Sequence, residues 1–164
     1  MSARILRAAV TALLLALSVP AAAAEFRDFD AGSMRGIRAE QAGKPFLLVF
    51  WSLYCEPCRE EMSQWGELQR RHPGVAIILV ATDPPQERVL MGKFLARHKL
   101  GKVQSWAFAD EFSERVRHSV DTRWRGELPR TYFYDRDHKA EARSGKVDAA
   151  TASGWLARAQ GKRG

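Results

Sequence analysis

Residues Phe46–Met62 read FLLVFWSLYCEPCREEM, and the rest of the chain can be placed around this stretch. The apolar run Phe46–Trp51 is short and follows the breaker Gly43-Lys44-Pro45, which is typical of a buried strand at the centre of a sheet. The polar residues after it favour a helix that ends near Arg71, before His72-Pro73-Gly74. Residues at helical spacing predict its inward face: Cys58, Met62, Trp65 and Leu68.

Cys55 and Cys58 are the only cysteines of the sequence. Pro57 suits the first turn of a helix, so Cys55 is expected at the helix N-terminus, where unpaired N–H groups and the helix dipole lower the pKa of a thiol. Cys58 lies three residues later, on the same helical face and within the Cα separation that a disulfide allows. We therefore predict a redox-active pair that opens and closes by thiol-disulfide exchange.

A structural disulfide and a metal site are the alternatives for this cysteine pair. So short a loop restrains little unfolded-chain entropy, which disfavours a purely structural disulfide. Zinc usually takes four ligands, and the histidines are too far apart to supply an H-x(3–5)-H partner: His72, His98, His118 and His138. We expect no metal, and no cofactor other than the redox-active disulfide.

The N-terminus has the layout of a secretory signal. Arg4 and Arg7 precede the apolar stretch Ala8–Val19, and Ala22-Ala23-Ala24 is the expected cleavage site. We predict a signal peptide at 1–24 and a single domain at 25–164, exported to the periplasm, where thiols tend to be oxidised. The alternatives are a short core helix and an uncleaved membrane anchor, although the apolar stretch is shorter than the roughly 20 residues that span a bilayer.

The charge is basic but mixed. The formal net charge is +7, and loss of residues 1–24 removes Arg4 and Arg7 and no acid, which leaves +5. Acidic residues are interleaved along the chain, and the basic run is the short Lys162-Arg163 tail. This pattern predicts a solvated surface and no nucleic-acid partner, while acidic partners and an anionic membrane surface remain open.

The remaining segments alternate between strand and helix patterns, which indicates an α/β domain with a largely parallel sheet. Val89, Leu90, Phe94 and Leu95 are expected to face the core, and Glu25–Asp30 shows little pattern of either kind. The predicted elements are a helix from Ser33, as its cap, to Gly43, a strand at 75–81, a helix at 86–98, a strand at 105–109, a helix at 111–120 capped by Asp110, a hairpin of strands 131–135 and 140–144, and a last helix capped by Asp148 and docked by Trp155 and Leu156.

The order of elements, the stretch FWSLYCEPCREE and the Leu128-Pro129 dipeptide before the edge hairpin together resemble the thioredoxin superfamily. The signal segment, the Cys-Glu-Pro-Cys motif followed by Glu61, and the strand-helix insertion at 75–98 resemble its exported TlpA-type branch, which includes the reductases of cytochrome c maturation. The resemblance covers about residues 33–160. It implies a thioredoxin fold, with a central mixed sheet flanked by helices and an inserted strand-helix unit.

The resemblance also implies roles for individual residues. Cys55 would be the exposed nucleophile and Cys58 the resolving, more buried thiol. Pro129 would be a cis-proline that faces the pair and leaves the backbone of Leu128 free to bind an extended substrate segment. The expected substrate-binding residues are Tyr54, Glu56, Pro57, Leu128 and Pro129.

Several positions depart from the family pattern. Val49 stands where cytosolic thioredoxins carry a buried acid used in proton transfer. Glu61 is the best substitute as proton acceptor from Cys58, or else a solvated surface charge. Tyr54 replaces a tryptophan and keeps an aromatic lip. His138 replaces a glycine in the hairpin turn, and we expect it to be structural.

The predicted activity is reduction of disulfides in exported partner proteins, with electrons supplied by a membrane protein. Glu56 places a negative charge beside the pair and disfavours the Cys55 thiolate, whereas Arg59 and the helix dipole favour it. A strong oxidant depends on a stabilised thiolate, so the neighbouring acid favours a reductant. The alternatives are a periplasmic disulfide oxidase or isomerase, and a non-catalytic thioredoxin-like binding or copper-chaperone module.

Overall fold

The computed structural model describes residues 25–109 and 113–161. The predicted signal peptide at 1–24 and the predicted cap Asp110 therefore lie outside the described residues. Within the described ranges, no helix combines the length and the apolar character that crossing a membrane requires.

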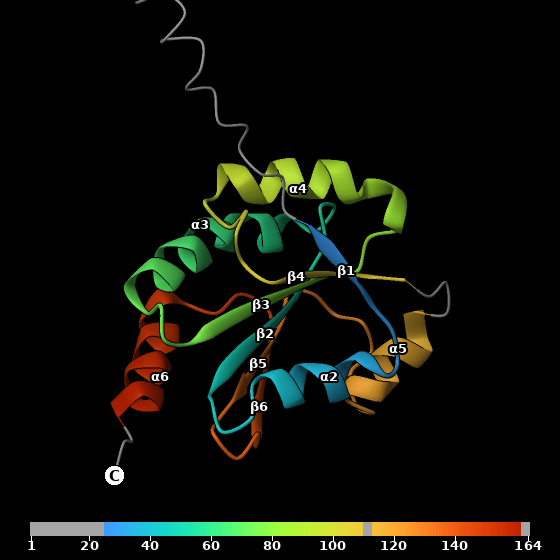
Figure 1. Cartoon of the computed structure of the whole chain (residues 1–164). Coiled ribbons are helices and arrows are strands. Elements are labelled where there is room, and N and C mark those ends of the chain that lie inside the picture. The colour runs from blue at the N-terminus through green and yellow to red at the C-terminus, as the bar shows by residue number, and fades with distance from the viewer. Residues whose placement is uncertain (1–24, 110–112, 162–164) are drawn as a thin grey trace, which may run out of the picture.

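A mixed sheet of six strands forms the centre of the domain, in the order β1-β4-β3-β2-β5-β6 (Figure 1). The predicted central strand is β2 (Phe46–Trp51), whose residues are all buried because it lies between β3 (Ala76–Ala81) and β5 (Arg130–Tyr134). Strand β2 is parallel to β3 and antiparallel to β5, and β6 (Ala140–Ser144) completes the predicted edge hairpin. The predicted α/β fold class is thus confirmed.

The other edge of the sheet contains a strand that the sequence analysis did not predict. Strand β1 (Phe26–Phe29) pairs in parallel with β4 (Ser105–Phe108), from Phe26 opposite Ser105 to Phe29 opposite Phe108. Its two phenylalanines are buried and the two residues between them are exposed, so the strand lacks the alternation of period two by which strands are recognised.

Helices cover both faces of the sheet, and the alternating side chains of β2 contribute to both (Figure 1). Leu47, Val49 and Trp51 pack in one hydrophobic cluster with residues of α3 (Glu56–Arg71), α4 (Arg88–Arg97) and α6 (Ala149–Gly161). Phe46, Leu48 and Phe50 pack in the other cluster with residues of α2 (Ser33–Glu40) and α5 (Ser113–Val120). Because the helix after the cysteines begins at the end of β2, the pair lies at the carboxyl edge of the sheet.

The predicted inner face of α4 is partly wrong. Val89 and Leu90 were expected in the core but are 70% and 48% exposed, whereas Leu95 is buried as expected, together with Met91 and Gly92. Met91 and Leu95 are four residues apart and share the inward face, and Val89, two residues before Met91, lies on the opposite side of the helix. The expected start of the helix at 86 is also shifted, because Pro85–Glu87 form a 3-10 turn and α4 begins at Arg88.

The predicted cap of α2 is also wrong, whereas that of α6 is confirmed. Ser33 is the first residue of α2 and Gly32 is its N-cap, because the Ser33 hydroxyl is hydrogen-bonded to the backbone and carboxylate of Asp30. Helix α2 ends at Glu40, short of Gly43, which has a left-handed φ of 69°. At α6, the Asp148 carboxylate accepts a 2.8 Å hydrogen bond from the Thr151 amide.

His138 has a left-handed backbone conformation, which glycine adopts most easily, and this explains why a glycine is common at this position of the hairpin turn. Its φ is 57°, and its Nε2 lies 3.0 Å from the carbonyl oxygen of Gln41. The ring also packs edge-on against Phe46. These contacts tie the hairpin turn to the end of α2, which agrees with the structural role that we predicted.

Candidate active site

Cys55 and Cys58 form a disulfide at the start of α3, with a Cα–Cα distance of 5.2 Å. Cys55 is the N-cap residue, and its sulfur accepts a 3.2 Å hydrogen bond from the Cys58 amide. Cys55 is partly exposed, whereas Cys58 is fully buried in the cluster beneath α3. An external disulfide can therefore reach the sulfur of Cys55, and the expected difference in burial between the two cysteines is confirmed.

The loop that leads into Cys55 is held by Asp83, a residue that the sequence analysis did not single out. The Asp83 side chain is 3% exposed and accepts hydrogen bonds from the Ser52 hydroxyl at 2.8 Å and from the Leu53 amide at 3.1 Å. The Ser52 oxygen in turn accepts a 3.0 Å bond from the Tyr54 amide. Burial raises the pKa of Asp83, and the hydrogen bonds from Ser52 and Leu53 act in the opposite direction.

The position of Asp83 could have been inferred from the predicted sheet. Strands β2 and β3 are parallel neighbours, with Trp51 opposite Ala81, so the residues that follow them emerge at the same edge. A short acceptor two residues beyond β3 can therefore reach free amides just beyond β2. The sequence analysis treated this segment only as a turn.

Glu61 is buried and is not a solvated surface charge, so that alternative is wrong. Its side chain is 4% exposed, and neither carboxylate oxygen has a well-formed hydrogen bond within the described residues. Burial raises the pKa of Glu61 to about 7, and the nearby Trp65 indole, Val147 backbone and Lys146 ammonium group only partly offset this rise. The Lys146 ammonium group instead pairs with Glu60, at 2.6 Å.

Glu61 lies next to Cys58 on the buried side of α3. Residues three apart on a helix have Cβ atoms about 5–6 Å apart, and both of these side chains are buried. A carboxyl group with a pKa near 7 can accept a proton from a neighbouring thiol at neutral pH and release it again. Val49 is fully buried in the same cluster as Cys58, so no acid is present at the thioredoxin position.

The Leu128–Pro129 peptide bond is cis, as the resemblance predicts. Pro129 is buried, and the half-buried Leu128 packs, like Cys55, against the cluster that contains Cys58. The loop before Leu128 is tied to β5 by Arg130, which donates to Asp121 at 2.9 Å and to Glu127 at 3.3 Å. These contacts hold the loop that contains the cis-proline against the start of β5.

The other predicted substrate-binding residues surround the opening at Cys55. Tyr54 is 74% exposed, and its hydroxyl donates to Glu87 at 2.9 Å. Glu56 and Pro57 are exposed in the first turn of α3. All three are thus exposed beside Cys55.

A hollow of about 580 Å³ lies beside Tyr54, between α3 and α4. Of the expected substrate-binding residues Tyr54 lines this hollow, whereas Leu128 and Pro129 do not. Its lining includes Leu53, Tyr54, Arg59, Leu90, Phe94 and Arg97. In residues 25–109 and 113–161 no cluster of histidine, cysteine, aspartate or glutamate side chains is arranged to hold a metal ion.

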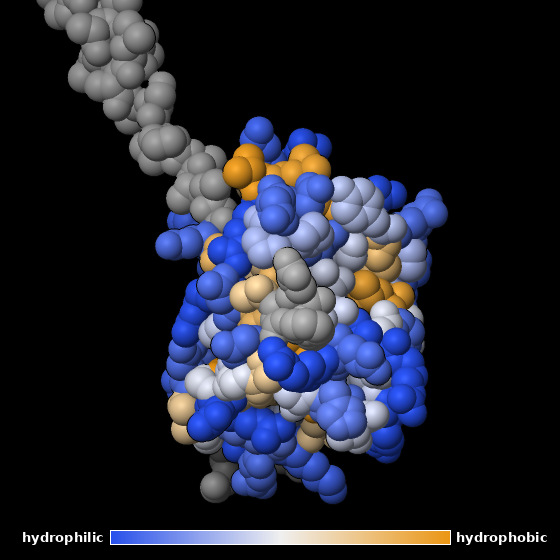
Figure 2. Space-filling view, turned by 90° about the vertical axis from the view of Figure 1, so that its right-hand side faces the viewer, coloured by the Kyte–Doolittle hydropathy of each residue, from blue (hydrophilic) through white to orange (hydrophobic). Residues whose placement is uncertain are grey.

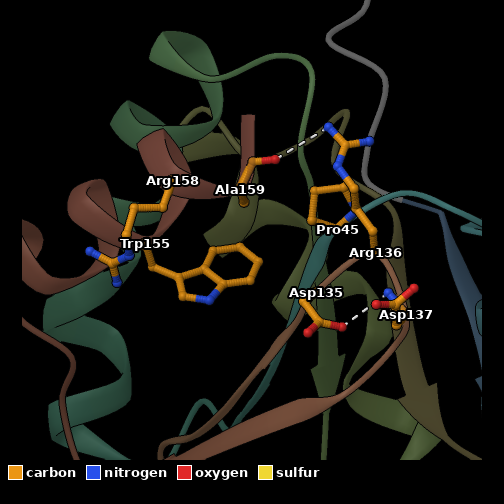
Figure 3. Close-up of a pocket in the computed structure, with 7 residues that line it drawn as sticks. All are labelled: Pro45, Asp135, Arg136, Asp137, Trp155, Arg158 and Ala159. Atoms are coloured by element: carbon orange, nitrogen blue, oxygen red, sulfur yellow. Dashed lines mark hydrogen bonds between the residues drawn. The ribbon is translucent and has the colours of Figure 1, made fainter. Parts of the chain in front are cut away.

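A second hollow, of about 250 Å³, lies at the opposite end of β2, where Pro45 precedes the strand (Figure 3). A strand of six residues is roughly 20 Å long, which separates this hollow from the disulfide. The Arg136 guanidinium donates to the Ala159 carbonyl at 3.4 Å, and the Asp135 carboxylate accepts amide hydrogen bonds of its own turn (Figure 3). These groups join the hairpin turn to α6, and we assign them no part in the exchange site.

Comparison with known proteins agrees with this geometry. No protein-family model matches the chain. The thiol-disulfide oxidoreductase ResA of Bacillus anthracis is 25% identical over 97 residues, which are 59% of this chain and 52% of ResA, and the ResA protein of Bacillus cereus matches equally. The chain thus spans about half the length of the curated relatives that it matches.

Two solved structures show the same fold. A thioredoxin family thiol:disulfide interchange protein from Chlorobium tepidum superposes with a TM-score of 0.61 at 18% identity, covering 76% of this chain and 85% of its own. A secreted Mycobacterium tuberculosis disulfide oxidoreductase homologous to Escherichia coli DsbE superposes with a TM-score of 0.60 at 22% identity, covering 73% and 85%. The chain therefore has the thioredoxin fold with a CXXC-type disulfide, and its homologues are thiol-disulfide oxidoreductases.

Proposed function

We propose that this chain is a thiol-disulfide oxidoreductase that reduces disulfides in exported partner proteins. The observation that carries the proposal is the pairing of a partly exposed Cys55, at a helix N-terminus, with a buried Cys58 in one disulfide. The amide that donates to the Cys55 sulfur also stabilises its thiolate after the disulfide opens. The exported location rests on the signal pattern of residues 1–24.

The reaction consists of two exchange steps. The Cys55 thiolate attacks one sulfur of the partner disulfide, whose S–S bond breaks as the mixed disulfide forms, and the released partner thiolate takes up a proton. The Cys58 thiolate then attacks the Cys55 sulfur, which re-forms the Cys55–Cys58 bond and releases the second partner thiolate. The partner gains two electrons and the chain loses two, so a membrane electron donor must reduce the pair again.

Glu61 supplies the proton acceptor that the second step needs. A buried Cys58 thiol is a poor nucleophile until it loses its proton, because only the thiolate attacks a disulfide. The Glu61 carboxylate is buried one helical turn away, and its pKa of about 7 suits proton uptake near neutral pH. Glu61 thus takes over the task of the acid that Val49 replaces.

The acids around the pair favour the reductive direction. Glu56 is in the first turn of α3, and Glu61 is buried on the inner side of the same helix. Negative charge near the pair disfavours the thiolates, and a strong oxidant depends on stabilised thiolates. The pair therefore gives up its electrons to a partner disulfide more readily than it would with basic neighbours.

The first experiment is the reduction potential of the Cys55–Cys58 pair, measured by counting free thiols in defined thiol/disulfide buffers. We expect a value at or below about −270 mV, that of thioredoxin. A value near −120 mV, that of a strong oxidant, would replace the reductase by an oxidase or isomerase. If the cysteine pair cannot be reduced and oxidised reversibly in these buffers, the redox activity is wrong and the alternative of a non-catalytic binding module is favoured.

Two variants test the order of the steps. Cys55→Ser should abolish reduction of a model disulfide, because it removes the accessible nucleophile. Cys58→Ser should instead accumulate a mixed disulfide with the partner, because the second attack is blocked. If Cys55→Ser and the wild type reduce the model disulfide equally fast, the proposed activity is wrong.

A further inference from the structure

The exposed large apolar side chains of the described residues gather beside the exchange site. They are Tyr54, Val89 and Leu90, and the Tyr54 hydroxyl is bonded to Glu87, two residues before Val89. In Figure 2 hydrophobic residues are visible at the top of the molecule, where Figure 1 places α4. Apolar side chains that are grouped on a protein surface often mark a place of contact with a partner.

The hollow between α3 and α4 continues this apolar surface inward. Leu90 and Tyr54 form its rim, and Leu53 and Phe94 line it below. Phe94 is half-buried and stacks on the fully buried Trp51 with ring centroids 5.7 Å apart, so this floor is anchored in the core. The volume of about 580 Å³ is in the range of pockets that enclose ligand groups, and a large apolar side chain can enter it.

The charged side chains that line the hollow are two arginines and one glutamate, an excess of positive charge. Arg59 and Arg97 both line it, and neither forms an ion pair within the described parts of the chain. The acid of the lining, Glu60, is already paired with Lys146 at 2.6 Å. An approaching segment with carboxylate side chains would therefore find complementary charge here, and a basic one would be repelled.

We propose that this hollow binds an apolar side chain of an acidic segment that flanks the reactive cysteine of the partner protein. The location supports this occupant, since Tyr54 immediately precedes Cys55 and Arg59 immediately follows Cys58. A partner held by its disulfide at Cys55 thus has its neighbouring residues over the rim of the hollow. The inference rests on the proposed function and adds the chemistry of the partner segment to it.

The experiment uses three synthetic peptides, each with one cysteine joined by a disulfide to 2-mercaptoethanol. The first carries a leucine and two glutamates near the cysteine, the second replaces the glutamates by lysines, and the third replaces the leucine by serine. The reduced chain should react with the first peptide about tenfold faster than with the second at low ionic strength, and this ratio should shrink at 1 M salt. It should also react with the first peptide severalfold faster than with the third.

Two variants and a matched control locate the effect. Arg97→Glu should bring the ratio of the glutamate to the lysine peptide to about one or below, and Leu90→Ser should do the same for the leucine to serine ratio. Both side chains are exposed or nearly half-exposed on α4, so the fold should tolerate these changes. Arg70→Glu makes the same charge change on α3, about 16 Å along the helix from Arg59, and should keep the wild-type ratios.

Neutral bis(2-hydroxyethyl) disulfide separates the two proposals. If the wild type reduces it but reacts equally fast with all three peptides, the docking site is wrong and the proposed function stands. If Arg70→Glu changes the peptide ratios as much as Arg97→Glu, the effect is one of net charge and the docking site is again wrong. If neither the peptides nor the small disulfide is reduced, both proposals fail.

Discussion

Glu61 and Asp83 are both buried carboxylic acids next to the cysteine pair, but within the described residues only Asp83 accepts well-formed hydrogen bonds. The Asp83 carboxylate accepts hydrogen bonds from the Ser52 hydroxyl and the Leu53 amide, both within 3.2 Å. Neither carboxylate oxygen of Glu61 has a well-formed hydrogen bond within the described residues. Burial raises the pKa of both groups. At Asp83 the hydrogen bonds from Ser52 and Leu53 oppose this rise. At Glu61 the nearby Trp65, Val147 and Lys146 offset it only in part, which leaves a pKa of about 7.

The difference separates two tasks that buried acids can perform beside one disulfide. A carboxylate that accepts several hydrogen bonds is fixed in place and holds the groups that donate to it. A carboxyl group without donors changes its protonation state near neutral pH and can carry a proton. Asp83 therefore positions the loop that precedes Cys55, and Glu61 has the character that the proposed proton transfer from Cys58 requires.

Replacement of Asp83 should have the largest effect, on stability. Asp83→Ala leaves the Ser52 hydroxyl and the Leu53 amide buried without an acceptor, so we expect the free energy of unfolding of the oxidised chain to fall by about 3 kcal/mol. Urea unfolding followed by tryptophan fluorescence measures this. Asp137→Ala, at an exposed turn position, is the control and should change it by less than about 0.5 kcal/mol. Equal effects of the two substitutions would show that Asp83 does not hold the loop.

The sequence predicted the elements whose residues have a clear period. The central strand Phe46–Trp51 is apolar throughout because it is buried on both faces, and the helix after Cys55 carries its inward residues at helical spacing. The positions of Cys55, Cys58 and the cis Leu128–Pro129 bond followed from the motif and the resemblance. The local sequence pattern was sufficient for elements whose burial follows a clear pattern along the chain, as in this strand and this helix.

What the sequence did not predict depends on neighbours that are distant along the chain. Strand β1 is short and lies at an edge, where its pairing with β4 and not its own pattern determines its conformation. Val89 and Leu90 were placed inward because the apolar residues of this segment fit more than one helical face, and the packing of Met91 and Leu95 in the core selects one of them. Asp83 became visible only when the parallel register placed it beside the end of β2.

Glu61→Gln should slow the second exchange step by about a hundredfold, the lower end of the usual effect of a general base. Glutamine fills the same space but cannot accept the Cys58 proton. The reduced variant is mixed with bis(2-hydroxyethyl) disulfide, quenched with acid and analysed by mass spectrometry, and the mixed disulfide at Cys55 should accumulate. Glu67→Gln, on the exposed side of the same helix, should leave no such intermediate. Rapid closure of the Cys55–Cys58 bond in Glu61→Gln would assign the proton transfer to another group.

Glu61→Gln should also change the free energy of unfolding. The change should be smaller than that caused by Asp83→Ala and should stabilise the chain instead of destabilising it. The pKa of Glu61 rises from 4.5 to about 7 on folding, so between these values the folded chain binds more protons than the unfolded chain and loses stability as the pH rises. Each pKa unit is worth about 1.4 kcal/mol, so the raised pKa of Glu61 costs the folded chain at most about 3 kcal/mol of stability above pH 7.

Glu61→Gln removes this pH-dependent loss, and the cost of its buried amide is the same at every pH, so the variant should gain about 2 kcal/mol over the wild type between pH 5 and pH 8. Urea unfolding of the oxidised wild type and variant at the two pH values measures it, and Glu67→Gln should show no such pH dependence because Glu67 is exposed. If the wild type and Glu61→Gln differ by the same amount at both pH values, Glu61 is ionised in the folded chain throughout this range. In that case Glu61, like Asp83, would accept hydrogen bonds that stabilise its ionised form, and the difference between the two acids would be lost.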